Sequence, residues 1–276
     1  MITNLVNIGC SANDRGFATS VDGVMIYYEV FGNGSTTLVF VHGGCCNRTH
    51  WGNQVNHFRK NFRVVVLDLG GHGKSGQNRN VWSIEKFGDD VVCVIKKLKL
   101  RNVILVGHSL GGDVILEAAL KLKQSVKALI AIDRFHEIEN KFTKEYVDER
   151  LKPLKENFVQ GMNDFSRPWL FISTTDSTLV DKIMNDMTSV PPQIGIGVLE
   201  NFMTYDKTIS QFEKLKIPVR FINCSSPPTH IESANRHIKD LKVKIMENVG
   251  HFVMLEDPEK FNRILDDVLS EIIEYG

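Results

Sequence analysis

The feature that most constrains the fold is a series of short, continuously apolar segments separated by stretches with helical periodicity. The apolar segments are rich in β-branched residues and occupy positions 38–41, 64–67, 103–106, 128–132 and 219–222. Continuous hydrophobicity is typical of parallel strands that helices cover on both faces. Helical periodicity follows at 84–98, 110–122 and 259–273. This alternation predicts an α/β fold with a doubly wound, mostly parallel sheet.

The N-terminal part of the chain carries weaker signals. Residues 23–31 alternate between apolar and other side chains, and they predict an antiparallel strand at the N-terminal edge of the sheet. We expect residues 1–19 to form an N-terminal extension, which can be disordered.

The strand pattern breaks between residues 135 and 206, after the sixth strand. This segment has charge-rich helical stretches, scattered aromatic and methionine residues, and the pair Pro191-Pro192. We predict a helical cap at 135–206, inserted into a core domain made of 20–134 and 207–276. The aromatic and methionine side chains can form a small core of the cap, line a substrate pocket, or do both.

Charge and cysteine content argue against several classes of partner. Lys+Arg and Asp+Glu both number 33, so a net charge of zero gives no electrostatic reason to expect nucleic acid or a membrane surface. The apolar runs are too short to cross a bilayer. Five irregularly spaced cysteines argue against a disulfide framework and favour a reducing compartment. We therefore expect a cytoplasmic protein, with a lipoprotein cleaved before Cys10, or another exported form, as the alternative.

The strongest local signal is the sequence GHSLGG at 107–112, directly after an apolar segment and at the start of a helical stretch. It is the G-x-S-x-G pattern in the strand–turn–helix context that the pattern requires. The sharp turn strains the backbone of Ser109, and Gly107 and Gly111 leave room for it. Ser109 is therefore the candidate nucleophile, presented beside a helix N-terminus that favours negative charge. The alternative is a glycine-rich turn with an incidental serine.

A serine hydroxyl needs a general base, and the chain has nine histidines. His251 follows the apolar segment 243–246 and precedes the last helical stretch. It should lie at the carboxyl end of a final strand, at the same edge of the sheet as Ser109. We predict that His251 is the base, whereas a lone histidine there would more often be structural.

The sequence His42-Gly43-Gly44 follows the strand at 38–41 and predicts a loop beside Ser109. We expect the N–H groups of Gly44 and Leu110 to form an oxyanion hole, and His42 to order the loop. The residues expected to line the substrate pocket are His42, Phe165, Trp169, Met184 and Phe252.

The motifs in their chain order resemble the α/β-hydrolase superfamily. They are HGG at 42–44, D-x-x-G-x-G-x-S at 68–75, GHSLGG at 107–112 and GHF at 250–252. The resemblance covers about residues 23–273 and is closest to small capped esterases. It implies an α/β-hydrolase fold and a serine hydrolase with a small-molecule acyl substrate. The superfamily also includes binding proteins and receptors, so the fold alone does not establish activity.

The third member of the catalytic triad departs from the superfamily pattern. The acid usually follows the strand represented here by 218–223, but the loop at 224–229 reads CSSPPT and has no carboxylate. Glu232 comes next, and it forms a capping box with Thr229 that should start a helix. Asp133, after the strand at 128–132, is the alternative, because some members resemble this arrangement. We predict that Asp133 is the acid. The alternative is a purely structural role as a loop anchor or a helix cap.

The sequence supports neither a dinucleotide-binding site nor a zinc site. GHGKSG at 71–76 spells a dinucleotide-binding motif, but the residues after it do not predict a helix. No histidine or cysteine pair has zinc-site spacing, and the predicted mechanism needs neither a metal nor a cofactor. The sequence therefore predicts acyl transfer through Ser109, His251 and Asp133, acting on a small carboxylic ester or a related compound. The alternative is a non-catalytic or single-turnover binding protein for a small molecule on the same scaffold.

Overall fold

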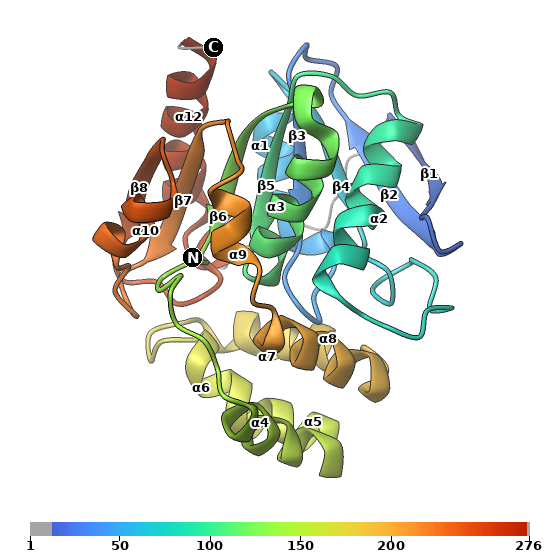
Figure 1. The fold of residues 1–276 in the computed structure, drawn as a ribbon, viewed down its shortest axis with the longest axis vertical. Helices are drawn as coiled ribbons and strands as arrows, with labels where there is room; N and C mark the ends of the chain where they lie inside the picture. The colour runs from blue at the N-terminus through green and yellow to red at the C-terminus, as the bar shows by residue number, and fades with distance from the viewer. Residues whose placement is uncertain (1–12, 275–276) are drawn as a thin grey trace.

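The computed structural model describes residues 13–274, and its central feature is one twisted sheet (Figure 1). Within that range the sheet has eight strands in the order β1-β2-β4-β3-β5-β6-β7-β8. β2 pairs antiparallel with β1 and β4, and the other pairings are parallel. The predicted α/β fold with a mostly parallel sheet is confirmed. The strands are β1 (Asp14–Thr19), β2 (Met25–Phe31), β3 (Thr37–Val41), β4 (Arg63–Leu67), β5 (Val103–His108), β6 (Val126–Ile132), β7 (Val219–Cys224) and β8 (Leu241–Met246).

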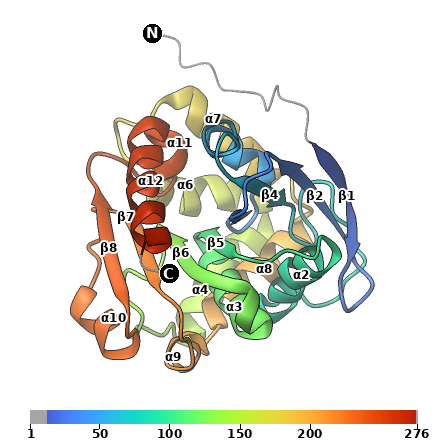
Figure 2. The same cartoon turned by 90° about the horizontal axis from the view of Figure 1, so that it is seen from above.

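Helices cover both faces of the sheet. In Figure 2, α2, α3, α9 and α10 lie on one face, and α12 lies on the other, where it packs against α1. The helices of this part are η1 (Arg48–Trp51), α1 (Gly52–Phe58), α2 (Ile84–Lys97), α3 (Leu110–Leu122), η2 (Lys123–Ser125), α9 (Thr208–Phe212), α10 (Ile231–His237), α11 (Val253–Glu256) and α12 (Pro258–Glu274).

The central strands explain the continuous apolar segments of the sequence. Every residue of β3 and of β5 is buried, whereas the edge strand β8 keeps exposed positions. The ring of Phe40, in β3, lies 4.9 Å from that of Trp51 in η1 and 6.3 Å from that of Phe58 in α1, centroid to centroid. Each such fully buried aromatic side chain contributes about 1.5–3 kcal/mol of hydrophobic free energy.

The register of the parallel strands brings two predicted site residues to one edge. β5 and β6 pair His108 with Ile132, and β6 and β7 pair Ile132 with Ile222. The next residues along the first two strands are Ser109 and Asp133, which leave the sheet at its carboxyl edge. The backbone N–H of Ser109 donates to the Ile132 carbonyl at 2.9 Å, so the two turns start side by side.

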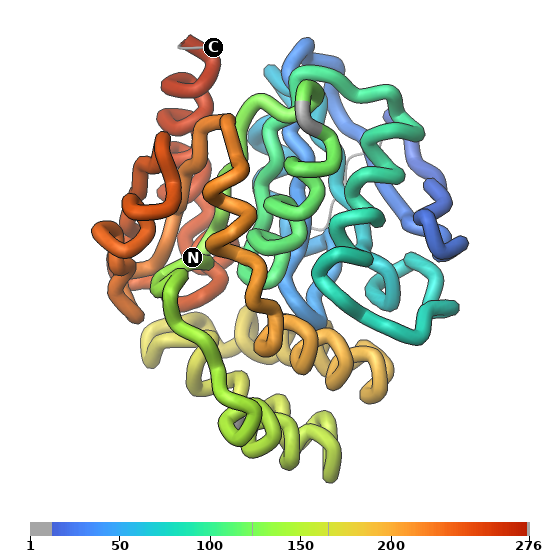
Figure 3. The backbone as a smooth tube through the Cα atoms, in the orientation of Figure 1, coloured from blue at the N-terminus to red at the C-terminus, as the bar shows by residue number. Residues whose placement is uncertain are grey.

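Helices between β6 and β7 lie beyond this carboxyl edge (Figure 1). The tube view follows the chain out of β6, through these helices and back through α9 to β7 (Figure 3). We call residues 135–206 the helical insertion; their division from the core as a separate cap domain stays a prediction. Its helices are α4 (Lys144–Glu156), α5 (Phe158–Gly161), η3 (Met162–Ser166), α6 (Arg167–Leu170), α7 (Ser177–Thr188) and α8 (Pro192–Thr204).

Two details of the N-terminal part differ from the sequence-based expectation. The predicted extension 1–19 is wrong for Asp14–Thr19, which is β1 and pairs along its whole length with β2. β2 is therefore an inner strand, and β1 is the edge. The short run DRGFAT carries too few apolar residues to stand out by pattern. Residues 1–12 lie outside the described part.

The predicted capping box at the start of α10 is also wrong. α10 begins at Ile231, with His230 as its N-cap residue and no side-chain cap bond. The Thr229 hydroxyl is engaged elsewhere: it accepts from the Asn223 side-chain amide at 2.9 Å and lies 3.2 Å from His136 Nδ1.

None of the helices in the described range combines the length and the apolar character that a membrane span requires.

Candidate active site

Ser109 lies on a sharp turn between β5 and α3, with a φ of +52°. A residue with a side chain pays strain there, of the order of 1 kcal/mol, so its surroundings must hold it. A Cβ on Gly107 would lie 2.2 Å from the carbonyl oxygen of Gly111, and a Cβ on Gly111 would lie 2.7 Å from that of Val41. Both positions therefore require glycine: Gly107 lets α3 approach β5, and Gly111 lets it approach the end of β3.

His251 and Asp133 come together at the carboxyl edge. His251 Nδ1 lies 2.6 Å from Asp133 Oδ2, and the carboxylate is almost fully buried while the imidazole is about one-fifth exposed. An Nδ1–H that donates to the carboxylate leaves Nε2 free to accept a proton. Asp133 thus occupies, relative to His251, the position that the orienting acid of a catalytic triad needs.

Asp133 is held in its ionised form. Burial acts to raise the pKa of its carboxyl group, but hydrogen bonds from His136 and His251 outweigh burial and lower it. Oδ1 also accepts the backbone N–H of Cys224 at 2.7 Å. Asp133 has a φ of +46°, and its own N–H donates to the Ile222 carbonyl, so the residue is held against the end of β7.

His108, the residue before the serine, contacts His251 through both its ring and a hydrogen bond. Its Nε2 lies 3.0 Å from the carbonyl oxygen of His251, and the two rings are 4.6 Å apart, centroid to centroid. Burial, followed by the proximity of His251, lowers the pKa of His108 well below its ordinary value. The ring is therefore neutral and donates from Nε2. Within residues 13–274 no hydrogen bond joins the Ser109 hydroxyl to His251; the contact with the His251 backbone is made by the side chain of His108, the residue before the serine.

Glu256 clamps the turn that carries His251. One carboxylate oxygen accepts the N–H of Gly250 at 3.0 Å, and the other accepts the N–H of Phe252 at 3.2 Å. The Thr175 hydroxyl, from the helical insertion, donates to the same carboxylate at 2.7 Å. The N–H of His251 itself donates to the Leu170 carbonyl at 2.9 Å. The insertion is therefore tied directly to the turn of the candidate base.

The loop after β3 lies against the serine turn. A Cβ on Gly43 would be 3.2 Å from Ser109 Cβ, and one on Gly44 would be 3.5 Å from Leu110 Cδ1. No hydrogen bond among the described residues uses the N–H of Gly44 or of Leu110, whereas the next N–H, of Cys45, donates to His72 Nε2 at 3.2 Å. Two backbone donors beside Ser109 are thus left for a ligand.

Comparison with known proteins agrees with this architecture. A family model described as alpha/beta hydrolase fold matches residues 36–163, which include the loop after β3, Ser109 and Asp133. The chain has the α/β-hydrolase fold. A thermophilic esterase from Thermogutta terrifontis superposes with a TM-score of 0.82 at 23% identity, over 94% of this chain and 99% of its own.

The relatives of this chain carry names that describe different functions. The bifunctional esterase/perhydrolase DCH of Acinetobacter calcoaceticus is 36% identical over 35% of this chain. The bacterial relatives at this level of identity are matched over little more than a third of their own length. The Karrikin insensitive 2 receptor IA of Petunia hybrida is 23% identical over 85% of this chain and 90% of its own.

The residues predicted to line a pocket lie in different environments. His42 is buried, with Nδ1 2.8 Å from the Gly43 carbonyl and Nε2 accepting the N–H of Leu69 at 3.0 Å, so both nitrogens serve the loop. Met184 is buried, and Phe252 is buried in a stack with Phe171. Trp169 is 69% exposed. The side chain of Phe165 lies outside the described part. A pocket role for these residues stays a prediction.

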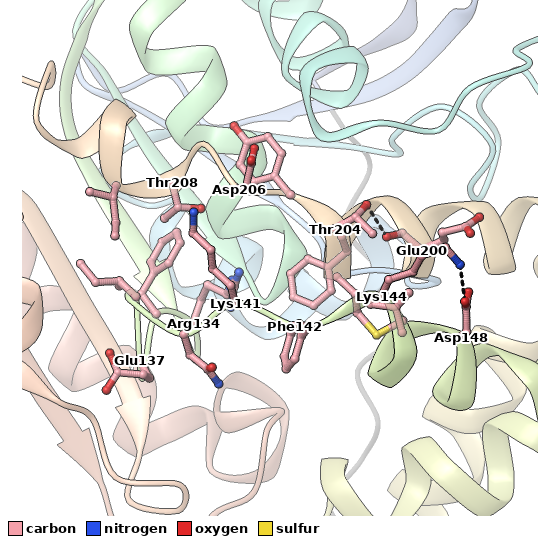
Figure 4. Close-up of a pocket in the computed structure, with 18 residues that line it drawn as sticks. Arg134, Glu137, Lys141, Phe142, Lys144, Asp148, Glu200, Thr204, Asp206 and Thr208 are labelled. Atoms are coloured by element: carbon pink, nitrogen blue, oxygen red, sulfur yellow. Dashed lines mark hydrogen bonds and ion pairs between the residues drawn. The ribbon is translucent and has the colours of Figure 1, made fainter.

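A cavity of about 530 Å³ lies elsewhere in this hydrolase fold, between the chain after β6 and helices α4, α8 and α9 (Figure 4). Aromatic side chains and Arg134 line it, but none of the predicted pocket residues does. Arg134 follows Asp133 in the sequence, yet its guanidinium turns away and pairs with Asp113 at 2.7 Å.

Three contributors to this site were not predicted: His136, Glu256 and the supporting role of His108. His108 is the variable position of the serine motif, and Glu256 lies five residues after His251, so neither carries a distinct pattern. His136 was hidden in the insertion, where no strand or motif marks its position. Its proximity to Asp133, at i+3, was the one available signal.

Proposed function

We propose that the protein is a serine hydrolase that cleaves a small carboxylic ester, or a related acyl compound, through an acyl-enzyme on Ser109. The observation that carries the proposal is the 2.6 Å contact between His251 Nδ1 and the buried, ionised Asp133, at the sheet edge where the serine turn emerges. A glycine-supported serine, an oriented imidazole and two unused N–H donors are the groups that acyl transfer needs.

The first half of the reaction forms the acyl-enzyme. His251 Nε2 takes the proton of the Ser109 hydroxyl as the oxygen attacks the substrate carbonyl. The carbonyl oxygen gains negative charge, which the N–H groups of Gly44 and Leu110 stabilise. Asp133 balances the positive imidazolium. His251 then gives the proton to the leaving alcohol, the ester C–O bond breaks, and the acyl group remains on Ser109.

The second half repeats these roles with water. His251 Nε2 takes a proton from a water molecule, whose oxygen attacks the acyl carbon, and the same two N–H groups hold the oxyanion. The bond to Ser109 breaks, the serine oxygen regains its proton from His251, and a carboxylic acid leaves. The similarity to proteins named esterases supports an ester as the substrate.

Reaction with a fluorophosphonate probe tests the proposal, because the probe needs an activated serine but no known substrate. The full chain should be labelled once, at Ser109, as read by intact mass and peptide mapping. Ser109→Ala should abolish the label, and Ser225→Ala, in the acid-free loop after β7, should keep it. A folded protein that resists both this probe and a smaller sulfonyl fluoride would overturn the proposal.

A small-molecule receptor is the second candidate function, favoured by the similarity to a karrikin receptor over most of the chain. Multiple turnover separates the two. A hydrolase releases product continuously from an ester or lactone panel, whereas a receptor that is acylated once gives a burst of one equivalent and then stops.

A further inference from the structure

A second cluster of chemically active side chains lies on the far side of Asp133. Asp133, His136 and Cys224 each place one ligand atom there, and these atoms lie within 4.8 Å of one another. The residues come from the end of β6, the chain after it and the end of β7. The proposed reaction moves no proton through Oδ1, the His136 ring or the Cys224 thiol; His136 only helps to keep Asp133 ionised.

The histidine of this cluster is held by partners of its own. His136 Nε2 lies 3.2 Å from Asp133 Oδ1, and Nδ1 lies 3.2 Å from the Thr229 hydroxyl. The hydroxyl can donate or accept, so it can hold the ring in either tautomer. The N–H of His230 donates to the His136 carbonyl at 2.7 Å and fixes the backbone. An imidazole with one nitrogen facing other ligands, and the other held by a second group, is typical of metal sites.

We propose that Asp133, His136 and Cys224 form a binding site for one divalent cation of the zinc class. A carboxylate, a thiolate and a neutral imidazole carry two negative charges, which a divalent cation balances. The mixed O, N and S set suits zinc better than calcium or magnesium, which prefer oxygen. Tetrahedral bonds of about 2.0–2.3 Å place two ligand atoms about 3.5 Å apart, so atoms up to 4.8 Å apart must close in by about 1.3 Å at most. The His136 side chain is 16% exposed, which leaves one side of the cluster open to solvent.

Binding requires one proton to leave. In the metal-free protein the Cys224 thiol donates to the Ser226 carbonyl at 2.9 Å, and burial, followed by the charge of Asp133, raises its pKa. The cation displaces this proton, which goes to solvent, and the sulfur lone pair forms the bond. The His136 proton moves from Nε2 to Nδ1, with no net change.

The site would act on the reaction proposed above, and this step rests on that proposed function. A cation on Oδ1 withdraws negative charge from the carboxylate that orients His251, so it weakens the base. The cation is therefore expected to inhibit esterase activity without competing with the substrate.

The test is a titration of the full chain with Cd²⁺ and with Co²⁺, read by the ultraviolet thiolate-to-metal charge-transfer band and the visible spectrum of tetrahedral cobalt. One equivalent should produce both signals. Cys224→Ser should remove the charge-transfer band, and His136→Gln should weaken binding by at least about tenfold. Cys93→Ser, which changes a free cysteine on α2, should leave the titration unchanged.

The spectra need no turnover, so failure of this site and failure of the proposed reaction are distinguishable. Circular dichroism of each variant checks the fold, and the two ligand variants give independent readings if one does not fold. Absence of a charge-transfer band in the native chain, or its persistence in Cys224→Ser, would overturn the proposal.

Discussion

Asp133 carries different partners on its two carboxylate oxygens. Oδ2 accepts from His251, while Oδ1 accepts the Cys224 N–H and faces His136. This arrangement explains how a carboxylate after β6 can take the role of one after β7. Asp133 has a positive φ, and its side chain reaches the end of β7, where it accepts the N–H of Cys224.

Removing the charge of Asp133 should therefore cost most of the turnover. Asp133→Asn is expected to lower kcat for ester hydrolysis by about 10⁴-fold, because the imidazolium loses its counter-charge and the ring its tautomer. Steady-state kinetics on an activated ester measure the change. Glu232→Gln, which alters the exposed acid on α10, is the matched control and should keep the native kcat. Near-native turnover by Asp133→Asn would sink the assignment.

The sequence alone predicted Ser109, His251 and Asp133, because each comes soon after a recognisable apolar segment and strand ends of a parallel sheet share one edge. It did not reveal Glu256 or His136. Glu256 acts on backbone N–H groups, which leave no trace in residue type, and only the i+3 spacing from Asp133 marked His136. The exposed Trp169 and the buried Met184 show the same limit, since burial within the insertion depends on how its helices dock.

At the scale of the element, the turn between β5 and α3 depends on the absence of two side chains. Gly107→Ala should destabilise the protein by more than about 2 kcal/mol, since the new Cβ would meet the Gly111 carbonyl at 2.2 Å and the backbone must move. Urea unfolding measures the free energy. Gly23→Ala is the comparison: its φ is +86° but no atom lies within 4 Å, so about 1 kcal/mol of strain alone is expected. Equal effects of the two changes would show that steric contact is not the cause.

The turn that carries His251 should depend on the Glu256 carboxylate that binds its N–H groups. Glu256→Gln replaces one acceptor oxygen with a donor, so it leaves the N–H of Gly250 or Phe252 without a partner. We expect kcat to fall by up to about 10²-fold through displacement of the imidazole, with a small change in KM. Glu259→Gln, an exposed change on α12, should be silent. Native kcat in Glu256→Gln would mean that the contacts with Asp133, His108 and Leu170 position His251 without this clamp.

Strands were easier to predict than the elements around them. The inner strands are continuously apolar because helices cover both faces, and that composition is visible in a single sequence. β1 is a two-sided edge strand whose position depends on pairing with β2 rather than on its own residues. The helices of the insertion bury only narrow stripes, so their ends could not be located from periodicity.

At the scale of the whole molecule, burial sets the charge state of several histidines. His42, His50, His72 and His108 are all buried, and burial lowers the pKa of each. They come from different segments around the sheet edge, and each makes a hydrogen bond inside the protein. The folded protein therefore holds them neutral, while the unfolded chain exposes them to water.

This difference makes the folded state sensitive to mild acid. The unfolded chain takes up protons as pH falls through about 6.5, whereas the folded chain does so only at a lower pH. Stability is therefore complete above about pH 6.5 and is lost as pH falls from there toward the lowered folded pKa values. Each histidine contributes a slope of up to about 1.4 kcal/mol per pH unit.

Urea unfolding between about pH 7.5 and about pH 5.5 measures this loss, because the window brackets the ordinary histidine pKa. The free energy of unfolding should fall toward the acid end, and His72→Gln should reduce the slope by the share of one group. A flat profile across the window would contradict a neutral buried set.

The fluorescence of the one exposed tryptophan can report on the helical insertion. Of the three tryptophans in the chain, Trp51 and Trp82 are buried, while Trp169 is 69% exposed. Trp169 directly precedes Leu170, whose carbonyl accepts the N–H of His251. A collisional quencher such as acrylamide therefore reaches mainly the Trp169 ring. This ring is next in sequence to the contact between the helical insertion and His251. Changes in the quenching of Trp169 fluorescence would follow movement of the helical insertion when a small molecule binds, with no added dye or label.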